Sequence, residues 1–337
     1  MRWIRLPSHR HHDPCGAFLP APTPKPPPME TSLRPTESQE ATRFAKCVHP
    51  LPVEDFLSRA WEKEVLHLAR HDPTYFADLF TLKDLDAYLG AARQGPKTPP
   101  IHLANAHKKP TAKVYLPDGT VDVSGVNAAF RSGDTLILNG MRYSWRPVED
   151  LCRSFEDVFQ HEVGANLYLT PAKSQGFSAH FDTHEVFVLQ LSGTKLWRIY
   201  HQEIEAPLVN QFHPLNLAEL PPPAFELTLR PGDLLYMPRG RVHEALSTDS
   251  TSMHLSVGIH TTRWVDALHA AISRLAEKDV SYRRSLPAGI LFAGAEAPAG
   301  VRDEFEALLQ RLGTEVPVTD VFKAVREAIL ERRGPRL

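Results

Sequence analysis

The spacing of apolar residues changes along the chain and separates regions of different structure. From about Pro52 onward, apolar residues recur at helical spacing, with short strand-like runs between the helices. Thr81 and Asp84, three positions apart, form a capping-box-like start for one of these helices. The pattern predicts helices over residues 53–61, 75–80, 82–92, 127–130 and 148–158, and strands over residues 101–103, 113–116 and 135–138.

The middle of the chain is a succession of short strands separated by turn residues. Strands are predicted over residues 165–170, 185–191, 195–200, 226–229, 233–237 and 254–259. This density of short strands favours a double-sheet jelly roll over a parallel sheet with crossover helices. Residues 205–223 form a long proline-containing insertion between two strands. Such a loop either shapes the mouth of a substrate site or is a plain surface loop, and the sequence leaves both open.

Helical spacing returns after Thr262. Helices are predicted over residues 264–275, 302–312 and 318–332. The first has an apolar stripe that includes Trp264 and Leu268, and the last has one that includes Phe322 and Val325. A segment of this size cannot easily bury both stripes within itself. We therefore expect it to pack on the strand-rich region or on a second copy of the chain.

Composition narrows the class of protein. The chain has 337 residues, 42% hydrophobic and 23% charged, as in ordinary globular proteins, and its net charge of -2 gives no case for nucleic-acid binding. Its three cysteines are widely spaced and form neither a disulfide framework nor a zinc motif, which fits the cytoplasm. No apolar run is long enough to span a membrane. Residues 1–44 are rich in proline and predicted to be disordered, and Met29 could be the true start.

Three residues of the strand-rich region suggest a metal site. His180 and Asp182 lie two positions apart, so on one strand both side chains would reach the same face. His243 follows a second strand and turn. Two histidines and one carboxylate on one side of an ion are the facial triad of non-haem Fe(II) oxygenases. A His-x-Asp pair alone is more often a solvated surface pair; the flanking strand and turn signals favour the metal site.

Other polar residues near these positions have competing interpretations. His184 has the same strand parity as His180 and could be a fourth ligand, but we favour a role in the pocket beside a complete triad. Asp233 belongs to a Pro-Gly-Asp turn, which makes it architectural rather than a ligand. Trp197 is expected in the core.

The order of these motifs resembles the JmjC-type 2-oxoglutarate oxygenases, and within them the cupin-like ribosomal oxygenases. The similar stretches are HFD at 180–182, GTKLWRIY at 193–200, PGDLLYMPRGRVHEA at 231–245, NGMRYSW at 139–145, residues 164–190, and RRSLPAG at 283–289. The resemblance covers roughly residues 50 to 290. It implies a mainly β double-stranded β-helix (jelly roll or cupin) with helical additions and a C-terminal helical segment.

The resemblance also implies roles for individual residues. His180, Asp182 and His243 match the iron ligands of the family. Lys195 matches the residue that binds the distal carboxylate of 2-oxoglutarate; the alternative is an exposed turn lysine. Residues that match the walls of the same pocket are Asn166, Tyr168 and, more weakly, Ser256. The implied cofactors are Fe(II), 2-oxoglutarate and O₂, and the implied reaction is hydroxylation of a substrate C–H with release of succinate and CO₂.

These observations predict three regions and one function. Residues 1–44 would be a tail, 45–262 the catalytic domain, and 263–337 a helical segment for homodimerisation. The expected substrate is a side chain of a protein, namely of a ribosomal protein, with a small molecule or tRNA as the alternative. Few residues follow Gly289, so we do not expect the complete winged helix of the full-length ribosomal oxygenases.

Overall fold

The computed structural model describes residues 2–3, 43–94, 100–290 and 298–333. Met29 and residues 4–42 of the predicted tail lie outside the described residues. The chain forms two compact units. The first extends to Phe159 and continues from Val163 to His260, and the second contains residues 160–162 and the helices that follow Thr261. No helix in the described ranges is long and apolar enough to cross a membrane.

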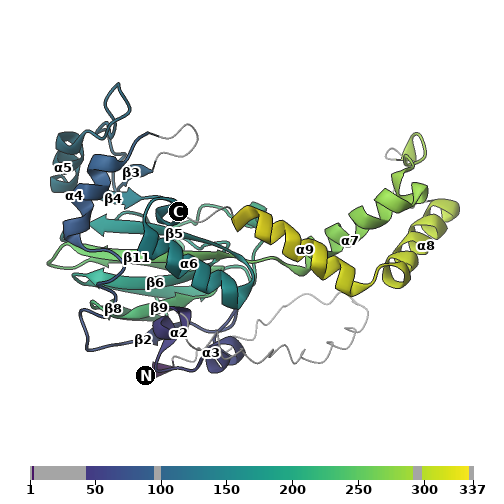
Figure 1. Cartoon of the computed structure of the whole chain (residues 1–337), viewed down its shortest axis with the longest axis horizontal. Helices are drawn as coiled ribbons and strands as arrows, with labels where there is room; N and C mark the ends of the chain where they lie inside the picture. The colour runs from purple at the N-terminus through teal and green to yellow at the C-terminus, as the bar shows by residue number, and fades with distance from the viewer. Residues whose placement is uncertain (1, 4–42, 95–99, 291–297, 334–337) are drawn as a thin grey trace. The chain divides into compact units, whose positions relative to one another are not determined.

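The first unit contains two sheets and the helices that precede and separate their strands (Figure 1). The large sheet has the strand order β1 (Arg2–Trp3), β2 (Leu66–Leu68), β9 (Leu234–Met237), β6 (Glu185–Ser192), β11 (Ser252–His260), β5 (Glu162–Thr170), β4 (Thr135–Leu138) and β3 (Ile101–Ala104). The small sheet has the order β10 (Arg241–Ser247), β7 (Lys195–Gln202) and β8 (Phe225–Leu229). The strand β6 runs antiparallel to both β9 and β11, and β7 runs antiparallel to both of its neighbours. This is the predicted double-sheet arrangement.

Strand β6 shows how the two faces of the large sheet are covered. Its side chains alternate, so Phe187 and Leu189 point to a core beneath the helices, while Val186 and Val188 pack between the sheets. The inter-sheet core also includes Ile199 of β7. Because both faces are buried, the strand is apolar along most of its length, as the sequence shows.

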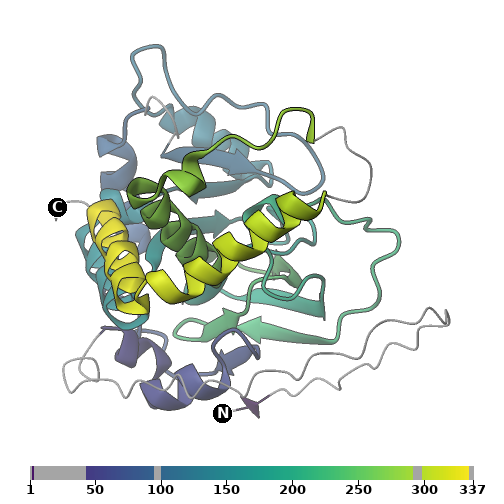
Figure 2. The same ribbon diagram turned by 90° about the vertical axis from the view of Figure 1, so that its right-hand side faces the viewer.

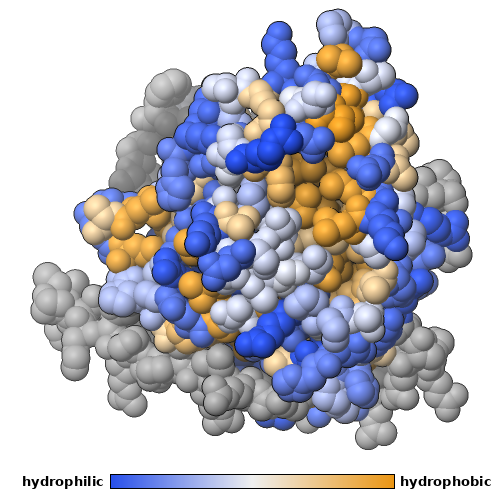
Figure 3. Space-filling model, turned by 90° about the vertical axis from the view of Figure 1, so that its left-hand side faces the viewer, coloured by the Kyte–Doolittle hydropathy of each residue, from blue (hydrophilic) through white to orange (hydrophobic). Residues whose placement is uncertain are grey.

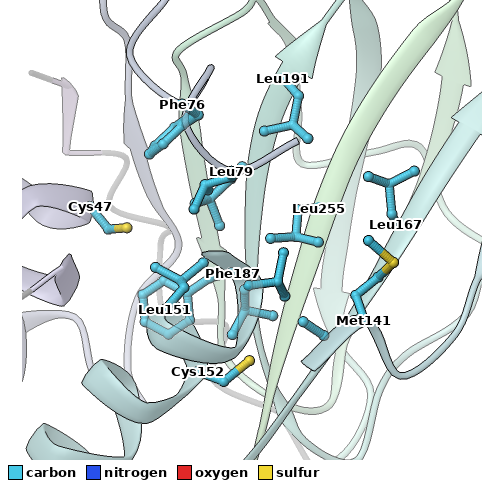
Figure 4. Close-up of a cluster of buried hydrophobic side chains, with 14 of the residues drawn as sticks. Cys47, Phe76, Leu79, Met141, Leu151, Cys152, Leu167, Phe187, Leu191 and Leu255 are labelled. Carbon is cyan, nitrogen blue, oxygen red and sulfur yellow. The ribbon is translucent and has the colours of Figure 1, made fainter. Parts of the chain in front are cut away.

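Helices cover the outer face of the large sheet. The helix α6 (Arg146–Phe159) lies across that face in Figure 1, and Figure 4 shows Leu151 and Cys152 of α6 beside Phe187 and Leu255 of the strands. These side chains belong to one buried cluster. The other helices of the unit are α2 (Arg43–Val48), α3 (Val53–Arg59), α4 (Leu82–Ala91), α5 (Val123–Arg131) and the short η1 (Met141–Tyr143) and η2 (Val209–Gln211).

On the face drawn in Figure 3, apolar side chains also gather around a hollow that hydrophilic side chains border.

The second unit contains α7 (Trp264–Lys278), η3 (Val280–Arg283), α8 (Ala299–Glu315) and α9 (Val318–Arg333), seen in Figure 2. Helix α7 packs on α9 through a small core formed by Ala267, Ala271 and Val321. Leu275 is also buried, but other large apolar residues of the predicted stripes are exposed: Trp264 is 59% exposed and Phe322 is 50% exposed. Each helix therefore keeps much of its apolar face outside the core of this unit.

Order begins earlier than predicted. Helix α2 starts at Arg43, not near Pro52, and Phe44 is fully buried with edge-on contacts to the rings of Phe56 and Phe155. The aromatic residue supplies enough buried area to hold this short helix on the core. The sequence pattern missed it because six residues are too few to show helical periodicity.

Other local predictions were also wrong or incomplete. Residues 75–80 form turns, not a helix, after an Asx-type turn in which Asp72 accepts hydrogen bonds from Thr74. Residues 113–116 contribute one bridge, from Tyr115 to Val121, instead of a strand. Helix α5 is longer than the single predicted turn because Asp122 caps it by accepting from the Gly125 amide. The strands β2 and β10 were not predicted, and neither was β1, which pairs with β2 although residues 1–44 were expected to be a disordered tail.

Candidate metal and cosubstrate site

A cavity of about 760 Å³ lies within the first unit. Side chains of β5, β7, β10 and β11 line it, together with the segments 176–184 and 212–217. The predicted insertion over residues 205–223 thus contributes to a cavity wall, through residues that include Phe212 and Leu217. Of the two interpretations of this loop, its position favours the one in which it shapes a site.

His180, Asp182 and His243 meet at this cavity. One potential ligand atom from each lies within 4.8 Å of those of the other two. His180 and His243 form an isolated antiparallel bridge, in which the His180 amide donates to the His243 carbonyl at 3.0 Å and the reverse bond is 2.8 Å. Asp182 precedes β6 in a segment without strand structure, and its carbonyl accepts from the Gly240 amide at 2.7 Å.

The predicted geometry of this trio was therefore wrong in one respect. His180 and Asp182 do not share a regular strand, since β6 begins only at Glu185. Backbone hydrogen bonds to the neighbouring segment 240–243 hold them instead. The missed strand β10 thus supplies His243 and also fixes the other two residues.

The imidazoles are oriented for metal binding. Nδ1 of His180 lies 2.8 Å from the Ser178 carbonyl, and Nδ1 of His243 lies 2.9 Å from the Arg241 carbonyl. A carbonyl can only accept, so each Nδ1 carries the hydrogen and each Nε2 presents its lone pair. Neutral imidazole and carboxylate with open positions beside them suit Fe(II), so the donor set fits this metal.

The surroundings keep His243 and Asp182 in the protonation states that a metal requires. Burial first, and then the neighbouring His180, lower the pKa of His243 to about 4, so His243 is neutral at pH 7. Burial alone would raise the pKa of Asp182, but the histidines around it, first His184 and then His243, hold that pKa below its ordinary value. Asp182 is therefore an anion at neutral pH.

Lys195 lies on another wall of the cavity and is 4% exposed. Its ammonium donates to the Thr170 hydroxyl at 3.1 Å. In the described part of the chain, no carboxylate lies within ion-pair distance of it. Burial consequently lowers the pKa of Lys195 from 10.5 to about 7. A buried cation of this kind fits an anionic ligand in the cavity, and the exposed turn lysine considered from the sequence is excluded.

Asn166 and Tyr168 project from β5 into the same cavity. Asn166 Oδ1 accepts from the Gly140 amide at 2.9 Å, which orients the side-chain amide, and the same side chain also forms a hydrogen bond with Tyr168. Burial first, and then the charge of Asp182, raise the pKa of Tyr168 to about 12. The phenol therefore keeps its proton and can donate at neutral pH.

Strand β11 lines the cavity with every second residue. His254, Ser256, Gly258 and His260 face it, whereas the residues between them, such as Leu255, belong to the core. The His254 ring stacks on Tyr168 with centroids 4.9 Å apart, and burial followed by the charge of Lys195 lowers its pKa well below the ordinary value. The sequence analysis named only Ser256. Strand parity could have identified His254, which lies two positions earlier.

The remaining candidates fall at three kinds of position. His184 lines the cavity but is not part of the three-residue cluster. Trp197 is 5% exposed and belongs to the inter-sheet core, as expected. It also lines the cavity, where its ring centroid lies 5.9 Å from that of His243. Asp233 accepts from the amides of Arg70 and Arg230, which is the architectural role expected of it. Thr170, missed in the sequence, is identified by its contact with Lys195.

Comparison with known proteins adds to this geometry. Residues 137–267 match the model of the JmjC domain, and they include the whole three-residue cluster. The chain contains a JmjC domain. The match also covers Lys195 and the strands on both sides of the cavity.

Curated relatives are similar along most of the chain. The "bifunctional lysine-specific demethylase and histidyl-hydroxylase NO66" of Aedes aegypti is 32% identical over 294 residues, which are 81% of this chain and 46% of that protein. Ribosomal oxygenase 1 of Gallus gallus is 33% identical over 293 residues, which are 83% of this chain and 48% of that protein. The chain thus spans about half the length of these relatives.

A solved structure supports the fold. YcfD, a ribosomal oxygenase from Escherichia coli in complex with cobalt and succinic acid, is similar with a TM-score of 0.52 and 18% identity, over 81% of this chain and 70% of that chain. The predicted fold class, a mainly antiparallel β core of the JmjC and cupin kind with C-terminal helices, is confirmed. So is the predicted resemblance of the JmjC region to the ribosomal oxygenases.

Proposed function

We propose that this protein is an Fe(II)- and 2-oxoglutarate-dependent oxygenase that hydroxylates a protein side chain. One observation carries the proposal: a metal-binding set of two histidines and a carboxylate opens onto the same cavity as a buried lysine for which the described residues supply no carboxylate partner. The relatives named ribosomal oxygenases and histidyl-hydroxylase support it.

In this proposal His180, Asp182 and His243 hold the metal. Three protein ligands leave positions for 2-oxoglutarate and O₂, and the bound metal would supply the activation of O₂ that no amino-acid side chain provides. The protein's own part is to bind and orient. Histidine Nδ1–H groups held by backbone carbonyls keep both Nε2 atoms directed at one point.

Lys195 would bind the far carboxylate of 2-oxoglutarate. The ammonium is fixed by Thr170 and the anion would replace the solvation that burial removes. Asn166 and Tyr168 of β5, in the large sheet, can donate hydrogen bonds into the cavity, and Ser256 of β11 can do the same. Trp197, on the same strand as Lys195, belongs to a buried apolar cluster and adds an apolar wall to this end of the cavity.

For the substrate we propose a side chain of a ribosomal protein. The names of the relatives support this choice, and so does the apolar rim, where Phe177, Phe212 and Leu217 line the cavity while remaining about half exposed. Such a rim can receive an extended polypeptide. A small molecule or a tRNA is the alternative substrate.

The proposal is tested by loading the protein with Fe(II) without oxygen, adding 2-oxoglutarate and then O₂, and measuring succinate. Parallel reactions contain ribosomal proteins or their peptides, tRNA, and small-molecule extracts. We expect ribosomal proteins to raise succinate production and to gain the mass of one oxygen atom. Absence of 2-oxoglutarate turnover with every substrate would contradict the assigned chemistry, and stimulation by tRNA alone would contradict the substrate.

We further propose a division of labour, with catalysis in residues 45–262 and homodimerisation through residues 263–337. The small buried core of the second unit and the exposure of Trp264, Leu268 and Phe322 support a partner surface there. An isologous pairing of these helices would cover such faces in both copies at once. Location in the cytoplasm stays a prediction, to be checked by imaging the tagged protein.

A further inference from the structure

A tight turn, Pro238 to Arg241, joins β9 of the large sheet to β10 of the small sheet. The Arg241 amide donates to the Pro238 carbonyl at 3.3 Å, and Gly240 has φ +81°, a conformation that favours glycine at the third position of a turn. A Cβ at Gly240 would lie 1.9 Å from the carbonyl oxygen of Ile204. The turn therefore lies directly against the segment that follows β7.

The same turn contacts two of the three proposed metal ligands. The Gly240 amide donates to the Asp182 carbonyl at 2.7 Å, and the Arg241 carbonyl accepts from Nδ1–H of His243 at 2.9 Å. The first contact fixes the backbone that carries the carboxylate, and the second fixes the orientation of the imidazole. A displaced turn would misalign both ligands.

Glu185, the first residue of β6, binds this turn. Its side chain is fully buried, and Oε1 accepts from the Arg239 amide at 3.4 Å and from Arg239 Nη1 at 3.2 Å. The other oxygen accepts from the Tyr236 hydroxyl. From the small sheet, Nε2 of Gln202 donates to the Arg239 carbonyl at 2.6 Å. Two polar side chains, one from each sheet, thus hold the turn.

The carboxyl group of Glu185 is costly at this position. Burial raises the pKa of Glu185 to about 7, although the hydrogen bond from Tyr236 and the charge of Arg239 oppose that shift. An apolar residue of similar size would avoid the cost of burying a carboxylate. The cost, together with the contacts to the turn, indicates a role other than stability.

We propose that Glu185 is a positioning residue: it holds the turn 238–241 and, through the turn, orients Asp182 and His243 for metal binding. The proposal rests on the proposed function only in taking His180, Asp182 and His243 as the metal ligands. Glu185 itself does not line the cavity, so its influence on the metal passes through the turn.

Metal binding tests this directly, with Co(II) as a spectroscopic probe and no substrate. Glu185→Leu removes both oxygens at similar size, and Glu185→Gln keeps a carbonyl oxygen for the Arg239 amide. We expect Glu185→Leu to weaken Co(II) binding about 10- to 100-fold and to alter the visible absorption of the bound ion, because Asp182 and His243 change orientation. Glu185→Gln should bind Co(II) more nearly as the parent does.

Glu156 provides the matched control, because it is also a buried carboxylate paired with a buried arginine. It is 2% exposed and accepts from Arg142 and, at 3.4 Å, from the Val163 amide. It belongs to α6 and does not line the cavity. Glu156→Leu should lower the melting temperature, as Glu185→Leu does, but leave Co(II) affinity and absorption unchanged.

A second measurement needs no metal. Hydrogen exchange followed by mass spectrometry should show faster exchange of the backbone amides of residues 239–243 in Glu185→Leu, and no such local change in Glu156→Leu. Gln202→Leu releases the same turn from its other side, so it should weaken Co(II) binding and speed the same exchange. It carries the test if Glu185→Leu does not fold.

Two results would overturn the inference. One is unchanged Co(II) affinity, absorption and amide exchange in folded Glu185→Leu or, if that variant is unfolded, in Gln202→Leu. The other is an equal loss of Co(II) binding in Glu156→Leu, which would make the effect one of general stability. A parent that does not bind Co(II) would refute the proposed function as well, whereas a parent that binds it as tightly as the turn variants do would refute only the role of Glu185.

Discussion

Replacing Lys195 with methionine removes an ammonium group from the cavity while keeping a side chain of similar length. Without an anionic partner the buried ammonium is unfavourable: burial lowers its pKa from 10.5 to about 7, which corresponds to roughly 5 kcal/mol against the charged form. A bound carboxylate would offset this penalty on the charged form by pairing with the ammonium. The lysine is therefore poised to bind an anion at neutral pH.

The size of the effect follows from the burial of the pair. Removing one partner from a buried charge pair costs about 2–5 kcal/mol. Because about 1.4 kcal/mol is a factor of ten, we expect Lys195→Met to weaken 2-oxoglutarate binding about 30-fold to several thousand-fold. Thr170→Val removes only the hydroxyl that Lys195 contacts. It should weaken 2-oxoglutarate binding by about 0.5–1.5 kcal/mol. Metal affinity should change little in either variant.

The assay is an anaerobic titration of 2-oxoglutarate into the Fe(II)-loaded protein. The absorption band of the complex is measured at each addition and gives the midpoint of binding. The control is Lys173→Met, whose side chain is 78% exposed and pairs only with the exposed Asp249. An unchanged midpoint in Lys195→Met would refute the reasoning, since it would place the distal carboxylate elsewhere.

The same lysine predicts a pH dependence. Its pKa is lowered in the folded protein, so the ammonium is present below about pH 7 and is lost as the pH rises through that value. Binding of 2-oxoglutarate should therefore weaken above pH 7, by up to about tenfold per pH unit, as expected when binding takes up one proton. Lys195→Met should lack this slope. A pH-independent affinity in the parent would contradict the role of the ammonium.

Three further predictions concern the metal, the assembly and the fold. Alanine at any one of the three proposed metal ligands should lower 2-oxoglutarate turnover more than about 100-fold without unfolding the protein. The reason is that loss of a residue that only hydrogen-bonds to a metal ligand already lowers metal affinity or activity about 10- to 100-fold. Normal turnover in a variant would show that the replaced residue is not a ligand. Phe322→Asp, at a position 50% exposed, should convert the proposed dimer to a monomer in light scattering while iron binding persists, and a parent that is monomeric across dilution would exclude the dimer. Gly193→Ala should destabilise the protein by more than about 1–3 kcal/mol in denaturant unfolding, because φ is +63° and the new Cβ would lie 1.9 Å from the Thr251 carbonyl oxygen. Gly90→Ala is the control and should not destabilise the protein, since no atom lies within 4 Å of its new Cβ.

Much of the fold was visible in the sequence because it depends on local patterns. The continuous apolar run of β6 is required by burial of both faces of that strand, so it could be read directly. The turn at Gly193 and the capping pair Thr81 and Asp84 are equally local, and the structure contains both. Lys195 was identified through its family resemblance, and its position at the start of β7 was predicted correctly.

The sequence by itself thus determined most of the strands and the longer helices, and the types of residue that could bind a metal. Only the tertiary structure decided how those residues meet. The backbone pairing of His180 with His243 joins segments far apart in the chain, and no local spacing encodes it. Likewise, His254 becomes a wall of the cavity only once β11 lies beside β6. Hydrophobic periodicity reports which face of an element is buried, but the identity of the neighbour across that face is set by packing between distant segments.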